Sequence, residues 1–393
     1  MIGRAPHGEL QMRSFQAWAA LLAMMANGWA AASDPLPPDQ FGMEPLPART
    51  PHWIYVVDSA FMNEIDSRVR LYDADTHGHL GQIDAGFFPG VTLSPDRNTM
   101  AVGTTYFARG GHGERTDVVE FTDMTTLALT GEIVLPAKRA QATPTYFNLG
   151  YSSDSHFLYA AYITPAASFG VLDPASRKVL GEIDTAGCVL VIPWGPDHVS
   201  SICDSGRLLT VTVDAQGNEV SRALSDMFFD VDTDPLFVQG IPTDRGYTFL
   251  SFLGKVHEVD FSGPEPLIHA PWSLVSVAEA GRWRPGGQQL GAIQRRMGRL
   301  YVAMHRGGEG THKKGGTEIW VFDLGTHRRI ARWPVAPLKL AAVTAVQVSQ
   351  DEAPLLFLAS DNPAAVATLD ALTGRLRHVD TNLGQTPWLI LNP

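Results

Sequence analysis

A short recurring phrase constrains the fold of this chain more than any other feature. Each copy is a β-rich run that ends in aspartate, followed by a polar turn and a second apolar run, as in VRLYDADTHGHLGQID (69–84) and FGVLDPASRKVLGEID (169–184). A second turn phrase, as in LSPDRNTMAVG from residue 93, runs out of phase with the first. Each unit therefore holds about four short strands. The seven marker aspartates are Asp73, Asp123, Asp173, Asp214, Asp260, Asp323 and Asp370.

The spacing of the repeat predicts an all-β fold. The markers recur at intervals from 41 residues (Asp173 to Asp214) to 63 residues (Asp260 to Asp323). Four-stranded units with periods of about 40 to 50 residues are typical of a β-propeller. Seven copies predict a seven-bladed propeller over residues 52–393, with a six- or eight-bladed ring as the alternative.

The two ends of the repeat predict how the ring closes. The first unit begins at residues 54–57 and lacks an innermost strand, whereas residues 388–391 form an apolar run without a partner in their own unit. We expect the C-terminal strand to join the N-terminal blade. The longest interval contains residues 272–290, for which we expect a short helical turn before the break at Pro285-Gly286-Gly287. We interpret Trp283 and this break as a structural turn.

The only two cysteines, Cys188 and Cys203, bracket a predicted hairpin. Residues 189–192 form an apolar run, residues 195–197 supply turn chemistry, and residues 199–202 resume a strand pattern. In an antiparallel pair the numbers of any two facing residues add up to the same sum. For Cys188 and Cys203 that sum is 391, which centres the turn between residues 195 and 196 and lets the two sulfurs meet. The spacing is too long for a C-x-x-C redox motif, and the segment lacks further zinc ligands. We predict a disulfide, worth about 3 kcal/mol, with buried free thiols as the alternative.

The N-terminus has the pattern of a signal peptide over residues 1–32. Arg13 precedes an apolar stretch (15–26), and small residues lead to a cleavage position after Ala32. Met12 is an alternative start, and an ordinary buried helix is the alternative structure. The apolar stretch is too short to span a bilayer comfortably. We therefore expect a soluble, periplasmic protein, which agrees with a disulfide.

The composition of the mature chain limits the classes of molecule that it can be expected to bind. Residues 33–51 form a proline-rich lead that we expect to lie extended over the surface. The formal net charge is -11 and the sequence pI is about 5.6. This balance argues against nucleic acid and anionic membranes as partners, whereas a basic protein would be attracted.

Signatures of self-contained catalysis are absent from the sequence. It has no G-x-S-x-G, H-E-x-x-H, P-loop or C-x-x-C-H motif. Residues 230–234 resemble the start of a calcium loop, but Pro235 and Ile241 occupy positions that require glycine and glutamate, so we interpret the run as a solvated turn. His305 and His312 could be metal ligands, yet the surrounding glycines and lysines favour a flexible basic loop.

Several runs without a general structural reason resemble one family, the heavy chain of quinoprotein amine dehydrogenases. These runs are the two cysteines together with IYVVDSAFMNEIDSRVRLYD (54–73), RGGHGERTDVVEFTD (109–123), WRPGG (283–287) and GEGTHKKGGTEIWVFD (308–323). The resemblance covers nearly the whole mature chain. Residues 58–62 and 310–313 resemble the aromatic (aralkylamine) dehydrogenase branch more than the methylamine branch.

The resemblance implies a division of labour between two chains. In this family a small light chain carries tryptophan tryptophylquinone and the catalytic aspartate, and the propeller holds it in a heterotetramer of two heavy and two light chains. The complex would oxidise primary, here aromatic, amines to aldehyde and ammonia, and pass electrons to a blue copper protein of the azurin or amicyanin type. The heavy chain itself would carry no catalytic residue, cofactor or metal.

The resemblance implies a role near the substrate for one residue of this chain, Phe87. In DAGFFP (84–89), the phenylalanine after the glycine corresponds to a residue that lines the substrate channel in the family. The alternative for Phe87 is ordinary packing between blades. We expect residues 109–115 and 309–314 near partner surfaces, with solvated blade loops as the alternative.

Two other classes of function remain open from the sequence. The chain could be a lactonase-like hydrolase, in which case acidic and amide residues of several blades should converge on a metal in the central channel. It could also be a binding or assembly protein without a redox partner.

Overall fold

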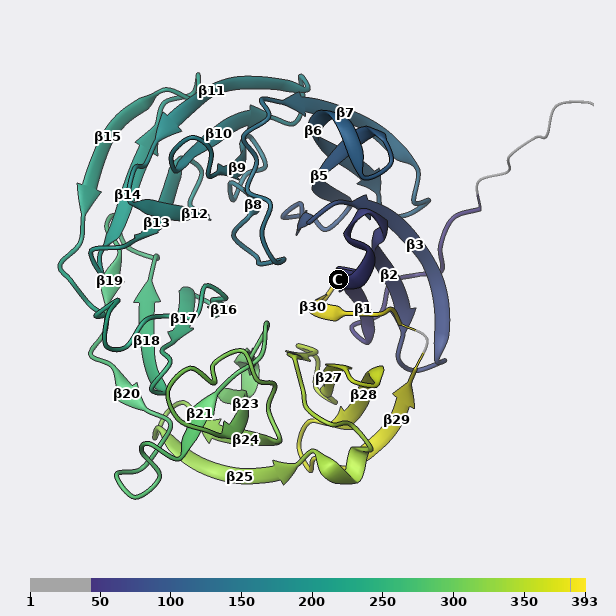
Figure 1. The fold of residues 1–393 in the computed structure, drawn as a ribbon, viewed down its shortest axis with the longest axis vertical. Coiled ribbons are helices and arrows are strands. Elements are labelled where there is room, and N and C mark those ends of the chain that lie inside the picture. The colour runs from purple at the N-terminus through teal and green to yellow at the C-terminus, as the bar shows by residue number, and fades with distance from the viewer. Residues whose placement is uncertain (1–43, 382) are drawn as a thin grey trace, which may run out of the picture. The chain divides into compact units, whose positions relative to one another are not determined.

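The computed structural model describes residues 44–381 and 383–393. The predicted signal peptide and the first part of the proline-rich lead lie outside the described residues. The compact unit from Pro45 to Pro393 consists of seven antiparallel sheets, so the predicted seven-bladed propeller is confirmed. Figure 1 shows the sheets following one another around a common axis in chain order.

Seven sheets form the blades, and in each the strands succeed one another from the propeller axis outward. From the innermost to the outermost strand, the first three blades are β30 (Pro387–Leu391), β1 (Trp53–Asp58), β2 (Ser67–Asp73) and β3 (Gly78–Gly86); β4 (Gly90–Leu93), β5 (Thr99–Arg109), β6 (His112–Asp123) and β7 (Leu129–Leu135); and β8 (Leu149–Tyr151), β9 (Leu158–Tyr162), β10 (Ser168–Asp173) and β11 (Lys178–Asp184).

The fourth and fifth blades continue the ring, and in the fifth β20 adds a second pairing to β18. Their strands are β12 (Cys188–Trp194), β13 (His198–Cys203), β14 (Leu208–Val213) and β15 (Glu219–Leu224); and β16 (Ile241–Pro242), β17 (Gly246–Leu250), β18 (Lys255–Asp260) and β19 (Leu267–Ile268), with β20 (Trp272–Ser273).

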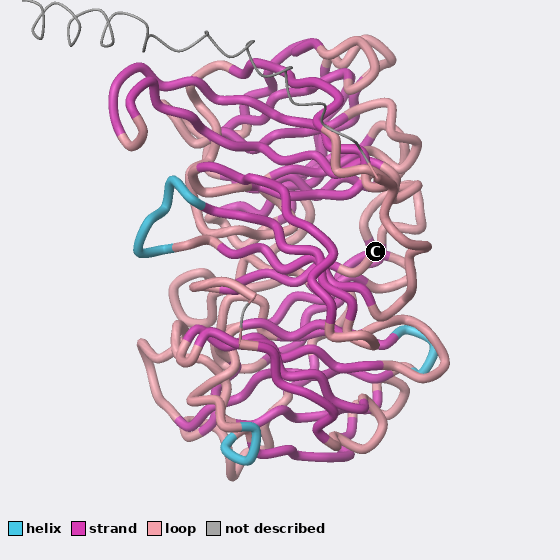
Figure 2. Tube along the Cα trace, turned by 90° about the vertical axis from the view of Figure 1, so that its right-hand side faces the viewer, coloured by secondary structure: helices cyan, strands magenta, loops and turns pink. Residues whose placement is uncertain are grey.

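The sixth and seventh blades complete the ring, and in the sixth both β21 and β22 pair with β23. Their strands are β21 (Trp283–Pro285) and β22 (Gly291–Gln294), β23 (Arg299–Arg306), β24 (Glu318–Asp323) and β25 (Arg328–Pro334); and β26 (Ala345–Val348), β27 (Leu355–Asp361), β28 (Ala364–Asp370) and β29 (Leu376–Asp380). In the part of the chain that the structure describes, three short 3-10 helices occur outside the sheets, η1 (Phe61–Asp66), η2 (Arg295–Met297) and η3 (Ala336–Leu338). Figure 2 shows these helices at the ends of the strands.

The ring closes as the sequence predicted. β30 pairs antiparallel with β1, and Val56 faces Ile390. Asp58 reinforces this closure, because its buried carboxylate accepts hydrogen bonds from the backbone N–H groups of Gln385 (3.0 Å) and Thr386 (2.8 Å). The chain end is therefore held by a sheet ladder and by a charged acceptor beside it.

The marker aspartates have one shared structural role. Each stands at or directly after the third strand of its blade and accepts hydrogen bonds from N–H groups two or three residues further on. This is an Asx turn, which starts the tight connection to the outermost strand. At Asp123 the N–H of Thr126 is the strongest of several groups that lower the carboxyl pKa.

The second turn phrase has a related local cause. Ser94 donates to Asp96 (2.5 Å), Ser152 to Asp154 (2.7 Å), and Ser349 to Asp351 in the turns between first and second strands. Both repeated phrases thus encode turns at the same end of the blades. The strands between them bury their side chains against the neighbouring blade, so that apolar clusters span adjacent sheets.

The predicted cysteine hairpin is formed by β12 and β13, with a bond between Cys188 and Cys203. Near the cysteines the register follows the predicted sum, but between Val189 and Ile192 it shifts by one residue. Leu190 has φ 74°, so a bulge occupies this position. The turn is therefore centred on residue 196 rather than between residues 195 and 196.

The longest interval differs from the prediction at Trp283. Residues 277–282 form consecutive hydrogen-bonded turns, and the N–H of Ala280 donates to the carbonyl of Ser276 four residues earlier (2.9 Å), so a short helical turn precedes the break as expected. Trp283 lies in β21, facing Arg306 of β23, and not in a turn. Pairing with β23 satisfies this backbone better than an isolated turn would.

Glu279 anchors that connection to the outer strand of the sixth blade. Its carboxylate accepts two hydrogen bonds from the guanidinium of Arg329 (2.9 and 3.0 Å) and one from the backbone N–H of Ser276 (3.1 Å). The bond from Arg329 is the largest of the effects that lower the pKa of Glu279 to about 2. A paired carboxylate of this kind holds the connection at every pH at which it is ionised.

The first prediction concerns the pH dependence of this anchor. Because the folded pKa is lowered from 4.5, Glu279 stabilises the fold above about pH 4.5, and this contribution is lost as the pH falls toward 2. We expect Glu279→Gln to lower the thermal midpoint at pH 7 and to approach the wild type at pH 2 to 3. Thermal unfolding at several pH values measures this difference. A difference that stays constant with pH would contradict the role of Glu279.

Candidate partner-binding face

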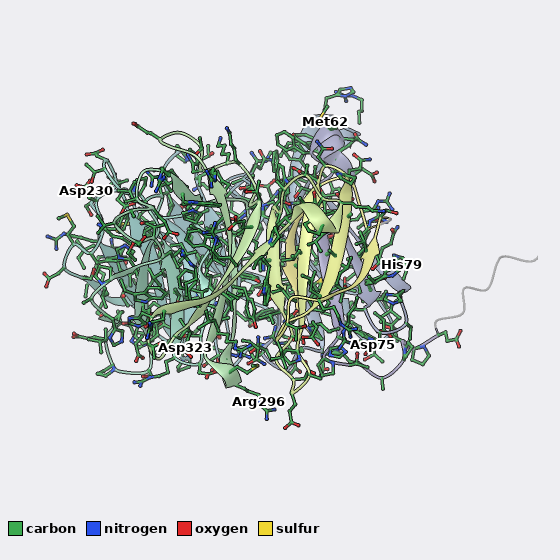
Figure 3. All side chains as sticks on the ribbon, turned by 90° about the horizontal axis from the view of Figure 1, so that it is seen from below. Met62, Asp75, His79, Asp230, Arg296 and Asp323 are labelled. Atoms are coloured by element: carbon green, nitrogen blue, oxygen red, sulfur yellow. A yellow bond between two sulfur atoms is a disulfide. The ribbon has the colours of Figure 1, made fainter. Side chains whose placement is uncertain are left out.

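The two ends of the blades differ in chemistry. We call the end with the aspartate-capped turns the turn face, and the opposite end, with connections between second and third strands and between blades, the loop face. Figure 3 shows Asp75, Arg296 and Asp323 on the turn face and Met62 and Asp230 on the loop face. The long connections all lie on the loop face, among them residues 136–148, 225–240 and 307–317.

Exposed apolar side chains gather in the connections and strand ends of the loop face. Met62 is 88% and Val277 is 97% exposed. Most other exposed apolar side chains lie on outermost strands, where one side necessarily faces solvent. Apolar side chains in irregular exposed segments are typical of a surface that binds a partner. Those on the loop face are Phe61, Met62, Ile65, Tyr106, Ile163, Val189, Met227, Val231, Val238, Leu253 and Val277.

Phe87 lies on the loop face, between β3 and β4. Its half-buried ring contacts Phe88 and Phe107 edge to face, with centroids 4.8 and 5.7 Å apart. Phe87 belongs to none of the buried apolar clusters between blades among the described residues. The turn itself requires Gly86, where φ is +56° and a Cβ would meet Thr104 Oγ1 at 2.3 Å. A half-exposed aromatic side chain is thus presented on a rigid turn.

A buried arginine holds the backbone of this turn. Arg139 is 3% exposed, and its guanidinium donates to the carbonyl oxygens of Phe87 (2.8 Å) and Phe88 (2.7 Å) and to Thr105 Oγ1 (2.8 Å). Burial is the main reason that the pKa of Arg139 falls to about 10, so the group stays charged at neutral pH. The charge is balanced by Asp117, which accepts from the backbone N–H of Arg139 (3.1 Å).

Asp117 also connects the second predicted loop to this network. The carboxylate accepts two hydrogen bonds from Arg115 (2.8 and 2.6 Å) and one from Thr105 (2.7 Å). Arg115 is the last residue of the predicted loop 109–115, which forms the tip of the β5–β6 hairpin, where Arg109 faces His112. The structure therefore brings this hairpin and the Phe87 turn together. Arg139 carried no signal in the sequence, because it stands outside every repeat phrase, whereas Asp117 lies within the run 109–123.

Residues 309–314 lie on another blade, in the loop between β23 and β24. Residues 309–312 of this loop border a groove of about 610 Å³ with Asp232, Phe252 and Arg284. The ring of His312 stacks on Phe252, 4.2 Å between centroids. His305 is not in the flexible loop, because it is buried in β23 and contacts Thr311 (3.0 Å).

The run at residues 230–234 is a turn, as predicted, but only part of it is solvated. Asp230 accepts from the N–H groups of Asp232 (2.9 Å) and Thr233 (3.1 Å). Asp234 is 4% exposed and accepts from the N–H of Leu253 (2.7 Å). Burial of Asp234 fixes this connection to the neighbouring loop.

The disulfide borders an apolar depression on the loop face. Cys203, Val189 and Phe229 line it together with the connection that follows β15, and its volume is about 400 Å³. The disulfide holds one wall of the depression, because it joins the first two strands of the fourth blade at their loop-face ends. The exposed side chains of Val231 and Val238 also line this depression.

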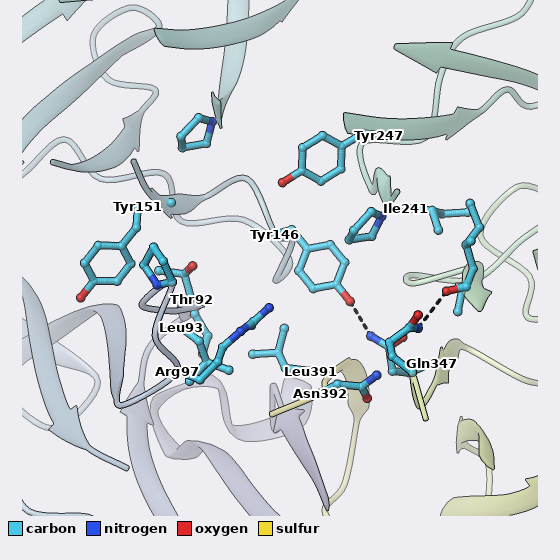
Figure 4. Close-up of a pocket in the computed structure, with 18 of the residues that line it drawn as sticks. Thr92, Leu93, Arg97, Tyr146, Tyr151, Ile241, Tyr247, Gln347, Leu391 and Asn392 are labelled. Atoms are coloured by element: carbon cyan, nitrogen blue, oxygen red, sulfur yellow. Dashed lines mark hydrogen bonds between the residues drawn. The ribbon is translucent and has the colours of Figure 1, made fainter. Parts of the chain in front are cut away.

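The propeller axis contains a polar plug that the sequence did not reveal. Tyr146 Oη accepts hydrogen bonds from the amides of Gln289 (2.6 Å) and Gln347 (2.9 Å), and both amides also donate to the carbonyl of Ile390 (3.0 Å each). A cavity of about 460 Å³ adjoins this plug, and Figure 4 shows Tyr146 and Arg97 projecting into it.

The lining of this axial cavity limits its chemistry. Its side chains are apolar residues, hydroxyls, amides and the arginines Arg97 and Arg295. No imidazole or side-chain carboxylate lines it among the described residues, so it lacks the ligand set that a metal in the channel needs. No described helix is long and apolar enough to cross a membrane.

Fold and surface together define a seven-bladed propeller with exposed apolar side chains in the connections of its loop face. Comparison with known proteins gives the family. The family model of the methylamine dehydrogenase heavy chain matches residues 50–392, and the chain belongs to this family.

Individual relatives agree with this assignment. The methylamine dehydrogenase heavy chain of Paracoccus versutus is 28% identical over 351 residues, 88% of this chain and 80% of that protein. The heavy chain of Methylophilus methylotrophus is 24% identical over 356 residues, 90% of this chain and 86% of that protein.

Solved structures support the fold alone. A protein of unknown function from Desulfotomaculum acetoxidans superimposes with a TM-score of 0.56 at 13% identity, over 87% of this chain and 98% of that one. A protein described as a putative 6-phosphogluconolactonase of Bacteroides fragilis gives a TM-score of 0.55 at 10% identity, over 86% and 97% of the two chains.

The second prediction concerns the buried arginine. Arg139→Met removes the donor from two carbonyls and leaves the charge of Asp117 less compensated, so we expect the free energy of unfolding to fall by about 3 to 5 kcal/mol. Arg109→Met at the exposed hairpin tip is the matched control and should stay within about 0.5 kcal/mol of the wild type. Urea unfolding followed by tryptophan fluorescence measures both. Equal stabilities of the two variants would refute the role of Arg139.

Proposed function

We propose that this chain is the heavy subunit of a periplasmic amine dehydrogenase and that its loop face binds the light chain. The observation that carries this proposal is the gathering of exposed apolar side chains on that face, with Met62 and Val277 almost fully exposed. The relatives are named as heavy chains, which describes one subunit of a larger assembly. A disulfide and the signal-peptide pattern of residues 1–32 support export to the periplasm.

In this proposal the light chain supplies the chemistry. It carries tryptophan tryptophylquinone and the aspartate base, and two heavy chains assemble with two light chains. The complex converts a primary amine into aldehyde and ammonia, and electrons pass to a blue copper protein of the azurin or amicyanin type. The heavy chain positions the light chain and borders the substrate route. A lactonase-like hydrolase is less well supported, because no acidic side chain lines the axial cavity among its described residues.

We further propose that the amine is aromatic. The support is the resemblance of residues 58–62 and 310–313 to the aralkylamine branch, together with the aromatic side chains beside Phe87. An edge-to-face aromatic cluster offers favourable contacts to an aromatic ring. The Arg139 network would keep this cluster in place when substrate enters.

The third prediction tests the division of labour. We expect the purified chain alone to have no quinone absorbance and no amine-dependent dye reduction, and a complex with the light chain to have both. Met62→Asp should weaken the binding of the light chain at least tenfold, because it places a charge in the apolar interface. Leu129→Asp, at a 61% exposed position on outer strand β7, is the matched control and should bind normally.

Two results would contradict this proposal. One is amine oxidation by the chain alone. The other is equal binding of the light chain by the Met62 and Leu129 variants, measured by calorimetry or by co-purification.

The fourth prediction concerns Phe87. If it borders the substrate route, Phe87→Ala in the complex should change the ratio of kcat/KM for aromatic and small aliphatic amines by about tenfold or more, with turnover retained. The matched control is Phe228→Ala, which removes a half-buried ring from the connection 225–240 on another part of the loop face and should leave the ratio unchanged. A destabilised propeller with an unchanged ratio would assign Phe87 to packing instead.

A further inference from the structure

The outer side of the closure seam holds a cluster of potential metal ligands. On its inner side the seam between the last and first blades is closed by β30 and β1. On the outer side, His77 in the turn between β2 and β3 meets His378 in β29, with ring centroids 3.8 Å apart. Asp380 follows two residues after His378 on the same strand, so both side chains face the same side.

The ligand atoms of these three residues lie close together. One atom each from His77, His378 and Asp380 lies within 4.8 Å of the others, and His378 Nε2 is 3.0 Å from Asp380 Oδ1. Ligand atoms of a tetrahedral Zn²⁺ site with bonds of about 2.0 to 2.1 Å are about 3.3 Å apart. His378 and Asp380 therefore already have the spacing of two ligands to one ion. His77 is exposed and can rotate to supply the third.

The carboxylate of Asp380 has an oxygen atom that could still accept a ligand. Its Oδ2 is buried and accepts no hydrogen bond from the described residues. No described lysine or arginine pairs with it, and the nearby Arg377 is directed to Asp370 (3.7 Å). The phenol of Tyr72 lies beside it, so the described neighbours of this carboxylate are one phenol and the imidazole of His378. A buried carboxylate without a lysine or arginine partner is costly, and a bound cation would offset that cost.

We infer that His77, His378 and Asp380 form a site for a divalent transition-metal ion of the Zn²⁺ type, which clasps the last blade to the first. Two imidazoles and one carboxylate suit Zn²⁺ better than Ca²⁺ or Mg²⁺, which prefer oxygen ligands only. Three protein ligands leave a fourth position for water. The site lies on the outer rim, where it would hold the seam that β30 closes from within.

Metal binding by the full-length mature chain tests this inference. We expect the metal-free protein to bind one Zn²⁺ per chain by calorimetry, with a higher thermal midpoint when Zn²⁺ is present. His378→Ala and His77→Asn should each weaken the affinity at least tenfold. Asparagine is chosen because it tolerates the left-handed backbone of residue 77, where φ is 57°. Co²⁺ provides a second readout, since ligation changes its visible spectrum.

A matched control makes the result decisive. His269→Ala removes an exposed histidine after β19, far along the chain from the seam, and should bind Zn²⁺ like the wild type. Absence of saturable Zn²⁺ binding to the wild type would overturn the inference. Binding that is equally strong in the His77, His378 and His269 variants would also overturn it, because the ion would then be held elsewhere.

Discussion

The fold depends on one pairing between segments more than three hundred residues apart, the ladder between β1 and β30. Without it the first blade would have an unpaired inner edge, and the ring would have two ends. Asp58 strengthens this pairing because a buried carboxylate binds the backbone at Gln385 and Thr386. Every other blade is completed locally. Apolar packing sets the position of each blade against its neighbour, and this one non-local contact joins the two ends of the row into a ring.

Much of the architecture could be predicted because its causes are local. An aspartate that caps a turn acts within two or three residues, so Asp123 and its six counterparts repeat in the sequence wherever the turn repeats. The cysteine hairpin was predictable for the same reason. The bulge at Leu190 was not, because its positive φ is imposed by pairing with β13 and not by a glycine. Trp283 was assigned to a turn because the break at Pro285-Gly286-Gly287 follows it closely, whereas its strand partner β23 lies beyond β22 in the chain.

The candidate site was less predictable, because its parts interact across blades. Phe87 was recognised only through a resemblance, and its environment depends on Arg139, which is 52 residues away and lies in an irregular connection. The axial plug likewise joins Tyr146 to Gln289 and Gln347 from other blades. No periodic pattern marks such residues. Polar side chains that become buried in this way contribute specificity to a structure, and a sequence shows them only as ordinary surface residues.

Arg139 binds the main chain of Phe87 and Phe88. The backbone conformation of this turn therefore does not depend on which side chains it carries. The backbone of the turn is fixed through its carbonyl oxygens, which every amino acid has, and not through the phenylalanine rings. Side chains at these two positions can therefore be exchanged with little displacement of the turn. In evolutionary terms, a lineage could change the surface offered at this turn by single substitutions, while the backbone that carries it stays the same.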